Sequence, residues 1–162
     1  MIDLRAELSD LAREASRLRE EIELYMADAA EKNAARERLS KSGLASNITK
    51  LYTGCEKILE YLAKNVDKAP ITHSDGGWHA KLLKRMSQPY RDIRPQIISE
   101  TLFTELDRLR AFRHRERTSY GADLIGSIVA DRAKEMADAA DLFRREVEAF
   151  VHAYIEPKDG DE

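Results

Sequence analysis

The chain has 162 residues, of which 35% are charged and 43% are hydrophobic, with seven Gly, four Pro and one Cys. This length suits a single domain, and the composition excludes a disordered chain poor in apolar residues. No apolar run approaches the roughly 20 residues that cross a bilayer, so we expect a cytoplasmic protein that makes no contact with a membrane.

The net charge of −3 hides an uneven distribution along the chain. Residues 81–117 carry ten basic and five acidic side chains, whereas residues 118–162 carry five basic and eleven acidic ones. Five arginines lie close together: Arg108, Arg110, Arg113, Arg115 and Arg117. Such a patch could bind nucleic-acid phosphates even in an acidic protein, because exposed charges act over only about 10 Å. The alternative is that these arginines pair with the acidic terminal segments or cover a solvated helix face.

Apolar residues recur at helical spacing through most of the chain. The first series predicts one helix that reaches Leu39 and is interrupted at Ser42 and Gly43; its apolar seam is Leu4, Leu8, Leu11, Ala15, Leu18, Ile22, Tyr25 and Ala29. A second helix is expected from near Leu44, with an apolar face that includes Ile48, Leu51, Cys55, Ile58 and Leu62. Because Cys55 lies in this face, we expect it to be a small buried hydrophobic residue that forms neither a disulfide nor a metal site.

The second half of the chain continues the helical pattern. Residues 67–77 hold a proline and two glycines and predict the longest loop, and a short helix with Trp78, Leu82, Leu83 and Met86 on one side follows. Pro89 and Pro95 bracket another break. Ser99 or Thr101 is expected to cap a helix with the apolar face Leu102, Leu106, Leu109 and Phe112. After a turn at residues 119–123, a last long helix is expected from Ile125 to Tyr154.

No segment shows the alternation of a β-strand, so the predicted fold is an all-α antiparallel bundle of about five helices over residues 1–156. Its first helix, over residues 1–39, would exceed about 50 Å at 1.5 Å per residue, which is long for a small bundle. The seam of this helix packs within the chain or against a second copy, and a coiled-coil arm is the other alternative. Residues 157–162 are expected to form a disordered tail.

Most chemical motifs are absent, and the four histidines are too dispersed to predict a metal site, so we expect no metal and no cofactor. The remaining candidate lies around the arginine cluster. If the helix continues, Arg113, Arg117 and Tyr120 share one face, and two guanidinium groups beside a phenol would suit a phosphodiester. His114 could move protons near neutral pH. The alternative is a basic helix end that neutralises its own dipole.

Several stretches resemble, in order, the HepT-like ribonuclease toxin domains of the HEPN superfamily. They are YTGCEKIL at 52–59, WHAKLL at 78–83, RPQIISE at 94–100, LRAFRH at 109–114 and SYG at 119–121. The resemblance covers residues 40–156, and the first helix matches only in character. It implies a helical bundle that forms a homodimer, with two copies of the active-site motif facing one another. It also implies a metal-independent endoribonuclease whose partner is a nucleotidyltransferase antitoxin that, in some pairs, adenylylates the motif tyrosine.

The family motif is Arg, four residues, His, one residue, Tyr. Arg113 matches the arginine and Tyr120 the tyrosine, but Thr118 occupies the histidine position. A threonine hydroxyl does not titrate near neutral pH and cannot replace imidazole as a general base. Three outcomes follow: His114 compensates, the dimer combines Arg113, Arg117 and Tyr120 without imidazole, or cleavage is lost.

Two main functions are therefore predicted. The first is a toxin that cleaves RNA, with Arg113 and Arg117 on the phosphate, His114 as acid and base, and Tyr120 as the modified residue. The alternative is a catalytically silent HEPN-fold module that binds a nucleotidyltransferase or RNA. The seam of the first helix also leaves open a coiled-coil interaction protein.

Overall fold

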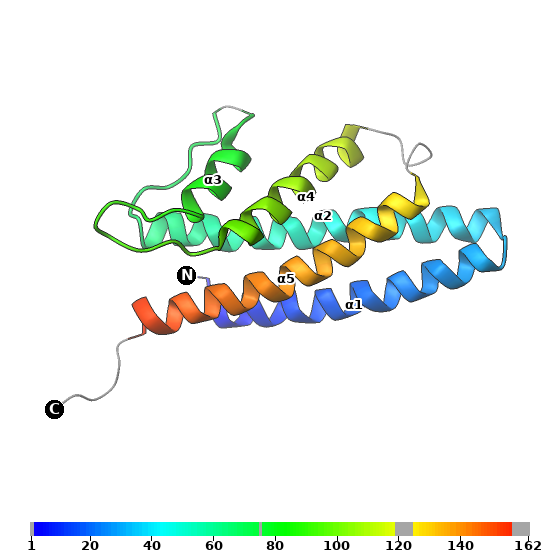
Figure 1. Ribbon diagram of the computed structural model, residues 1–162, viewed down its shortest axis with the longest axis horizontal. Coiled ribbons are helices and arrows are strands. Elements are labelled where there is room, and N and C mark those ends of the chain that lie inside the picture. The colour runs from blue at the N-terminus through cyan, green and yellow to red at the C-terminus, as the bar shows by residue number, and fades with distance from the viewer. Residues whose placement is uncertain (1, 75, 119–124, 157–162) are drawn as a thin grey trace.

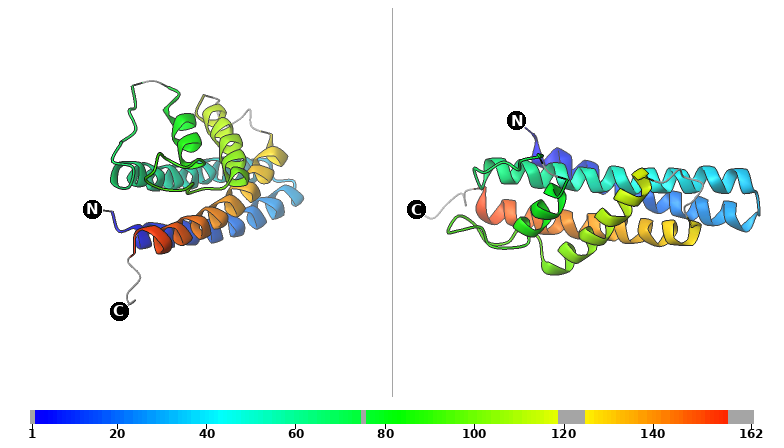
Figure 2. Two further views of the ribbon diagram at one scale, coloured as in Figure 1. Left: turned by 60° about the vertical axis from the view of Figure 1, so that its left-hand side comes forward. Right: turned by 90° about the horizontal axis from the view of Figure 1, so that it is seen from above.

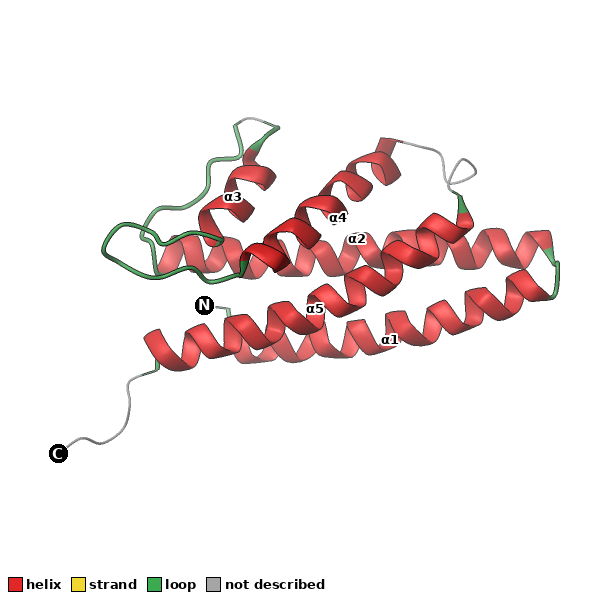
Figure 3. Cartoon of the chain, in the orientation of Figure 1, coloured by secondary structure: helices red, strands yellow, loops and turns green. Residues whose placement is uncertain are grey.

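The computed structural model describes residues 2–74, 76–118 and 125–156, with the backbone alone for residues 116–118. Within these ranges the chain forms five α-helices and no β-strand, which confirms the predicted all-α bundle (Figure 3). The helices are α1 (Leu4–Ala30), α2 (Ala34–Asn65), α3 (Trp78–Met86), α4 (Glu100–Thr118) and α5 (Gly126–Tyr154). In the part of the chain that is described, no helix combines the length and the apolar character that a membrane span needs.

Helices α1, α2 and α5 form the long body of the molecule, and α3 and α4 lie against one side of it (Figures 1 and 2). α1 packs against both α2 and α5 and runs antiparallel to them. α3 contacts α2 and α4, and α4 also contacts α5. The seam of the N-terminal helix is therefore covered within the chain, which decides between the alternatives left open by the sequence.

The break between the first two helices lies earlier than the sequence indicated. The predicted helix over residues 1–39 is wrong: α1 ends at Ala30, and the chain turns at residues 31–33. Lys32 adopts a φ of 53°, and the Asn33 side chain caps α2 by accepting a hydrogen bond from the Arg36 amide at 3.1 Å. Residues 42 and 43, expected to end the helix, instead lie inside α2, because one glycine costs a helix only about 1 kcal/mol.

The predicted apolar faces form the core. In α1 the buried side chains are Leu8, Leu11, Ala15, Leu18, Ile22 and Tyr25, all members of the predicted seam. Cys55 is buried, as predicted, and Trp78 packs against the core while remaining partly exposed. Ser99 caps α4, since its hydroxyl accepts a hydrogen bond from the Leu102 amide at 3.2 Å. The spacing of apolar residues was thus sufficient to predict which face of each helix is buried.

A buried ion pair holds the loops on either side of α3. The Asp67 carboxylate accepts hydrogen bonds from Arg94 Nε at 2.5 Å and Nη2 at 2.9 Å, and from Arg85 Nε at 2.8 Å. Arg94 also donates to the backbone carbonyl of Gln88 at 3.1 Å. The paired charges thereby fix the loop after α2 against the connection between α3 and α4, and so position α3 beside α4.

Candidate active site

Arg113, the arginine of the predicted motif, lies at the end of the buried face of α4. Its neighbour Phe112 belongs to the core, and the Arg113 side chain is only 13% exposed. The guanidinium therefore points toward α2 and α3, and only a small part of the side chain remains accessible. Nη1 lies 3.3 Å from Oε1 of Glu56, which comes from α2.

Glu56 is the centre of the cluster around Arg113. Its side chain is 4% exposed, and a carboxylate that is so deeply buried needs charged or hydrogen-bonding partners. Oε1 faces Arg113, and Oε2 forms a short hydrogen bond with Nδ1 of His79, the second residue of α3. Three helices thus each contribute one polar side chain to the same buried point.

The hydrogen bonds of this cluster assign the proton on the imidazole. Nδ1 of His79 contacts Oε2 of Glu56 and lies 3.4 Å from Nη1 of Arg113. A carboxylate accepts only, so the closer contact requires Nδ1 to carry a proton and donate it to Glu56. In the neutral ring the lone pair is then on Nε2, and no described residue forms a hydrogen bond with that nitrogen. The His79 side chain is 21% exposed.

Tyr52 closes the cluster on the side of α2. The Arg113 guanidinium lies 5.6 Å from the centre of the Tyr52 ring, within the range of a cation–π contact. Burial, and next the negative charge of Glu56, raise the pKa of the Tyr52 hydroxyl. Among the described residues, neither the Tyr52 hydroxyl nor Nε of Arg113 has a hydrogen-bond partner, although both are buried. Two buried polar atoms of the cluster therefore lack a partner within the described part of the chain.

Aromatic rings cover the outer side of the cluster. The rings of Trp78 and His79 stack with their centres 3.6 Å apart, and His73 lies 4.2 Å from Trp78. His73 pairs in turn with Glu60 of α2. These contacts restrict the rotation of the His79 ring and keep it against Glu56.

Of the residues predicted from sequence, the structure describes Arg113 and His114 in full. It places Arg113 in the buried cluster, whereas His114, the next residue of α4, is exposed. The side chains of Arg117 and Thr118, and all of Tyr120, lie outside the described residues. Whether the predicted face of Arg113, Arg117 and Tyr120 assembles therefore stays a prediction.

Two other arginines of the basic cluster pair with carboxylates. This agrees with the alternative stated above, in which the arginines pair with acidic segments or cover a solvated helix face. Arg108 lies 3.5 Å from Glu135 of the acidic helix α5, and Arg110 lies 2.8 Å from Asp107 on its own helix. Much of the local positive charge is thus neutralised by neighbouring carboxylates. Arg113 differs from these two because its partner is buried.

Sequence reasoning missed Glu56 and His79. One signal was present: Glu56 lies next to Cys55 and four residues after Tyr52, so it falls on the buried face of α2, where an unpaired carboxylate would be costly. His79 carried no periodic signal, since its partner is 23 residues away. Both residues do lie within the stretches that carried the family resemblance.

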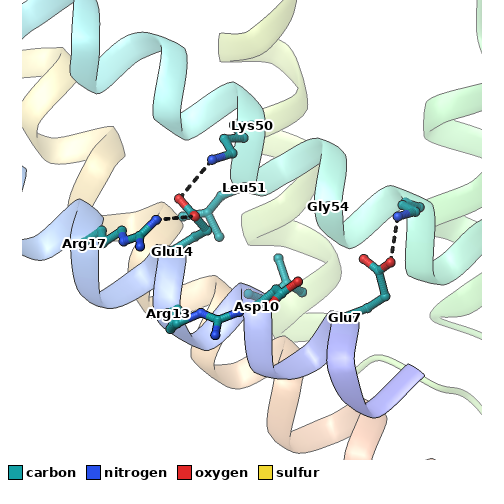
Figure 4. A pocket seen from close by; sticks show the side chains of 10 residues that line it. Glu7, Asp10, Arg13, Glu14, Arg17, Lys50, Leu51 and Gly54 are labelled. Carbon is teal, nitrogen blue, oxygen red and sulfur yellow. Dashed lines mark hydrogen bonds and ion pairs between the residues drawn. The ribbon is translucent and has the colours of Figure 1, made fainter. Parts of the chain in front are cut away.

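A separate groove of about 520 Å³ lies between α1 and α2 (Figure 4). Charged side chains line it, and they pair with one another: Lys50 lies 3.2 Å from Glu14, and Lys57 lies 2.7 Å from Glu7. None of the predicted motif residues lines this groove, nor does any member of the Glu56 cluster. It is therefore not the candidate active site.

Comparison with protein families gives a match to the part of the chain that contains this cluster. A family model described as HepT-like protein matches residues 43–154, a range that begins in α2 and ends at the last residue of α5. Searches of curated proteins and of solved structures gave no match. The matched range contains Glu56, His79 and Arg113, so the buried cluster lies inside the shared domain. The chain belongs to the HepT-like family of the HEPN superfamily.

Proposed function

We propose that the protein is a toxin of a HEPN/nucleotidyltransferase pair and acts as a metal-independent endoribonuclease at the interface of a homodimer. The main support is the position of Arg113, the motif arginine of a HepT-like chain. Its guanidinium is held by Glu56 at 3.3 Å, and 13% of the side chain remains exposed. A guanidinium held in this way could bind a phosphodiester without first losing side-chain entropy.

The proposed reaction is transesterification within RNA. The 2′-hydroxyl oxygen attacks the adjacent phosphorus while a base takes the hydroxyl proton. The bond from phosphorus to the 5′-oxygen then breaks, and an acid donates a proton to that oxygen. The products are a 2′,3′-cyclic phosphate and a 5′-hydroxyl end. Arg113 and Arg117 would stabilise the charge on the five-coordinate phosphorus, and His114 is the proton carrier suggested by the sequence.

Regulation by a nucleotidyltransferase would act on Tyr120 in this proposal. In adenylylation the phenolic oxygen of Tyr120 attacks the α-phosphorus of ATP, pyrophosphate leaves and the phenolic proton is released. The phosphodiester that forms adds a negative charge. In a segment that also holds Arg113, Arg115 and Arg117, this charge would compete with RNA for the guanidinium groups. Co-expression with the cognate enzyme should add one adenylyl mass, and Tyr120→Phe should prevent the addition. An unchanged mass of the wild-type chain would exclude this form of regulation by that enzyme.

RNA cleavage by the purified protein, in the presence of a chelator, tests the proposed activity. We expect Arg113→Ala to lower the rate at least about 10²-fold, in the range found when one transition-state donor is removed. Arg108→Ala is the matched control, because it removes an arginine of the same helix whose partner is Glu135. Equal RNA loss with the wild-type chain and Arg113→Ala would identify a contaminating nuclease and reject the proposal.

A catalytically silent binding module is the second candidate, and Thr118 at the histidine position of the motif favours it. The two candidates differ in what Thr118→His should do. New cleavage in a previously inactive chain would show that the wild-type domain had only lost its imidazole. Absence of cleavage in both chains, together with stable binding of the nucleotidyltransferase, would support the scaffold function.

A further inference from the structure

We infer that His79, held by Glu56, is the proton carrier that the motif lacks at Thr118. This inference rests on the proposed ribonuclease function and names a catalytic residue outside the motif. It starts from the contact between the Glu56 carboxylate and Nδ1 of His79, and from the 3.4 Å between that nitrogen and Nη1 of Arg113. An imidazole thus lies directly beside the guanidinium that is proposed to bind phosphate.

The carboxylate gives the imidazole the tautomer that general-base catalysis requires. Since Nδ1 donates its proton to Glu56, the lone pair of the neutral ring is on Nε2. A buried carboxylate in this position also stabilises the imidazolium that forms once Nε2 has taken a proton. Glu56 acts here as a positioning residue, because its contacts are with His79 and Arg113 and not with the reacting atoms.

The accessibility of the two side chains fits this division of roles. Glu56 is 4% exposed and cannot meet a substrate, whereas His79 is 21% exposed and can present one edge of its ring. Among the described residues, Nε2 of His79 forms no hydrogen bond. Stacking on Trp78, with ring centres 3.6 Å apart, holds the plane of the imidazole. The ring is therefore oriented before any substrate arrives.

His114 fits the role less well. It is adjacent to Arg113 on α4, and neighbouring helical residues point about 100° apart. It is exposed, whereas Arg113 turns inward toward α2. His79 reaches the guanidinium from a different helix and is already within 3.4 Å of it.

The test measures RNA cleavage by the full-length protein and its variants over a range of pH. His79→Asn keeps an amide N–H that can still donate to Glu56 but removes the titrating nitrogen. We expect it to lower the rate about 10²- to 10⁴-fold, the usual contribution of a general base. His152→Asn is the matched control, because His152 also lies near a glutamate, Glu156, but belongs to α5 and is exposed; it should stay within threefold of wild type.

The pH profile separates a chemical role from a structural one. Protonation of Nε2 removes the base, so the wild-type rate should fall as the pH is lowered, and this fall is the acidic limb of the pH profile. The charged groups that face the ring are Glu56 and Arg113. The residual rate of His79→Asn should lack this acidic limb. Glu56→Gln, which keeps an acceptor for Nδ1 but removes the charge, should change the pH at which this limb falls.

Each outcome decides a different claim. If the wild-type chain does not cleave RNA, the proposed function fails and this inference fails with it. If the wild type cleaves, Arg113→Ala does not, and His79→Asn retains the rate and the acidic limb, the inference alone is wrong. Loss of activity in His114→Asn with full activity in His79→Asn would assign the role to His114. Should His79→Asn unfold, His79→Gln provides the same comparison.

Discussion

Asp67 and Arg94, 27 positions apart in the sequence, form a two-point ion pair that is almost fully buried. Nε of Arg94 lies 2.5 Å from one carboxylate oxygen and Nη2 lies 2.9 Å from the other, and the side chains are 0% and 1% exposed. Nη1 of Arg94 donates to the backbone carbonyls of Gln88 and Pro95, which lie in the connection between α3 and α4. The pair therefore determines where α3, and with it His79, lies relative to α4.

Arg94→Ala is expected to lower the free energy of unfolding by about 3–5 kcal/mol, because it leaves the buried Asp67 carboxylate with Arg85 alone. Urea denaturation followed by circular dichroism measures this change. Arg19→Ala is the matched control, since Arg19 pairs with Asp138 and Asp141 but is 42% exposed, and a surface pair contributes at most about 1 kcal/mol. Equal effects of the two substitutions would contradict a special role of the buried pair.

Two glycines of α2 should respond in opposite ways to replacement by alanine. Nothing lies within 4 Å of the position that a Cβ on Gly43 would occupy, so Gly43→Ala should stabilise the helix by about 0.5–1 kcal/mol. A Cβ on Gly54 would lie 2.9 Å from Cδ2 of Leu11, where α1 packs closely against α2. Gly54→Ala should therefore destabilise the protein by about 1 kcal/mol, since overpacking outweighs the gain in helix propensity.

Thermal unfolding of both glycine variants beside the wild type measures the difference. Gly43→Ala should melt at the highest temperature and Gly54→Ala at the lowest. An equal gain in both would mean that Leu11 moves aside without cost, and that the close approach of α1 and α2 at this point is not needed.

The sequence predicted the helices well where one physical signal dominated. Apolar spacing identified the buried face of α1 from Leu8 to Tyr25, because burial of one stripe is what stabilises an amphipathic helix. It failed at the turn between α1 and α2. There Lys32 takes a positive φ and Asn33 supplies the cap, whereas the glycine at position 43, which looked like a stop signal, lies inside a helix.

The candidate site was predictable only in part, for a related reason. Arg113 was found through a local motif, since helical spacing and the family pattern both operate within a few residues. Its partners Glu56 and His79 lie 57 and 34 residues away, and only the packing of α2, α3 and α4 brings them together. Tertiary pairing of this kind leaves no periodic trace in one sequence.

Tyr52 should make the stability of the protein sensitive to alkaline pH. Its pKa is raised above the ordinary value, first by burial and then by the charge of Glu56, so the unfolded chain ionises at lower pH than the folded one. The stability is therefore complete below about pH 10 and should fall by up to about 1.4 kcal/mol per pH unit above it. Tyr52→Phe should reduce this decline in denaturation curves collected between pH 9 and 11.

The same substitution tests the unpaired hydroxyl at neutral pH. Because the Tyr52 hydroxyl has no hydrogen-bond partner among the described residues, its removal should cost little and could stabilise the protein by about 1 kcal/mol. Tyr154→Phe is the control, since that ring is 60% exposed, and it should keep the alkaline decline of the wild type. A loss of several kcal/mol in Tyr52→Phe would show that the hydroxyl is hydrogen-bonded in solution.

Cys55 should be unreactive toward thiol reagents while the protein is folded. Its side chain is buried in the face of α2, and burial, followed by the charge of Glu56, raises the pKa of the thiol. Since the thiolate is the nucleophile, both the missing access and the raised pKa slow the reaction. With a disulfide reagent at pH 8, we expect less than about a tenth of the rate measured for the chain in denaturant. Fast modification without loss of helical signal would mean that α2 separates from the core in the native state, and the buried contacts assigned to Glu56 and Tyr52 would then be wrong as well.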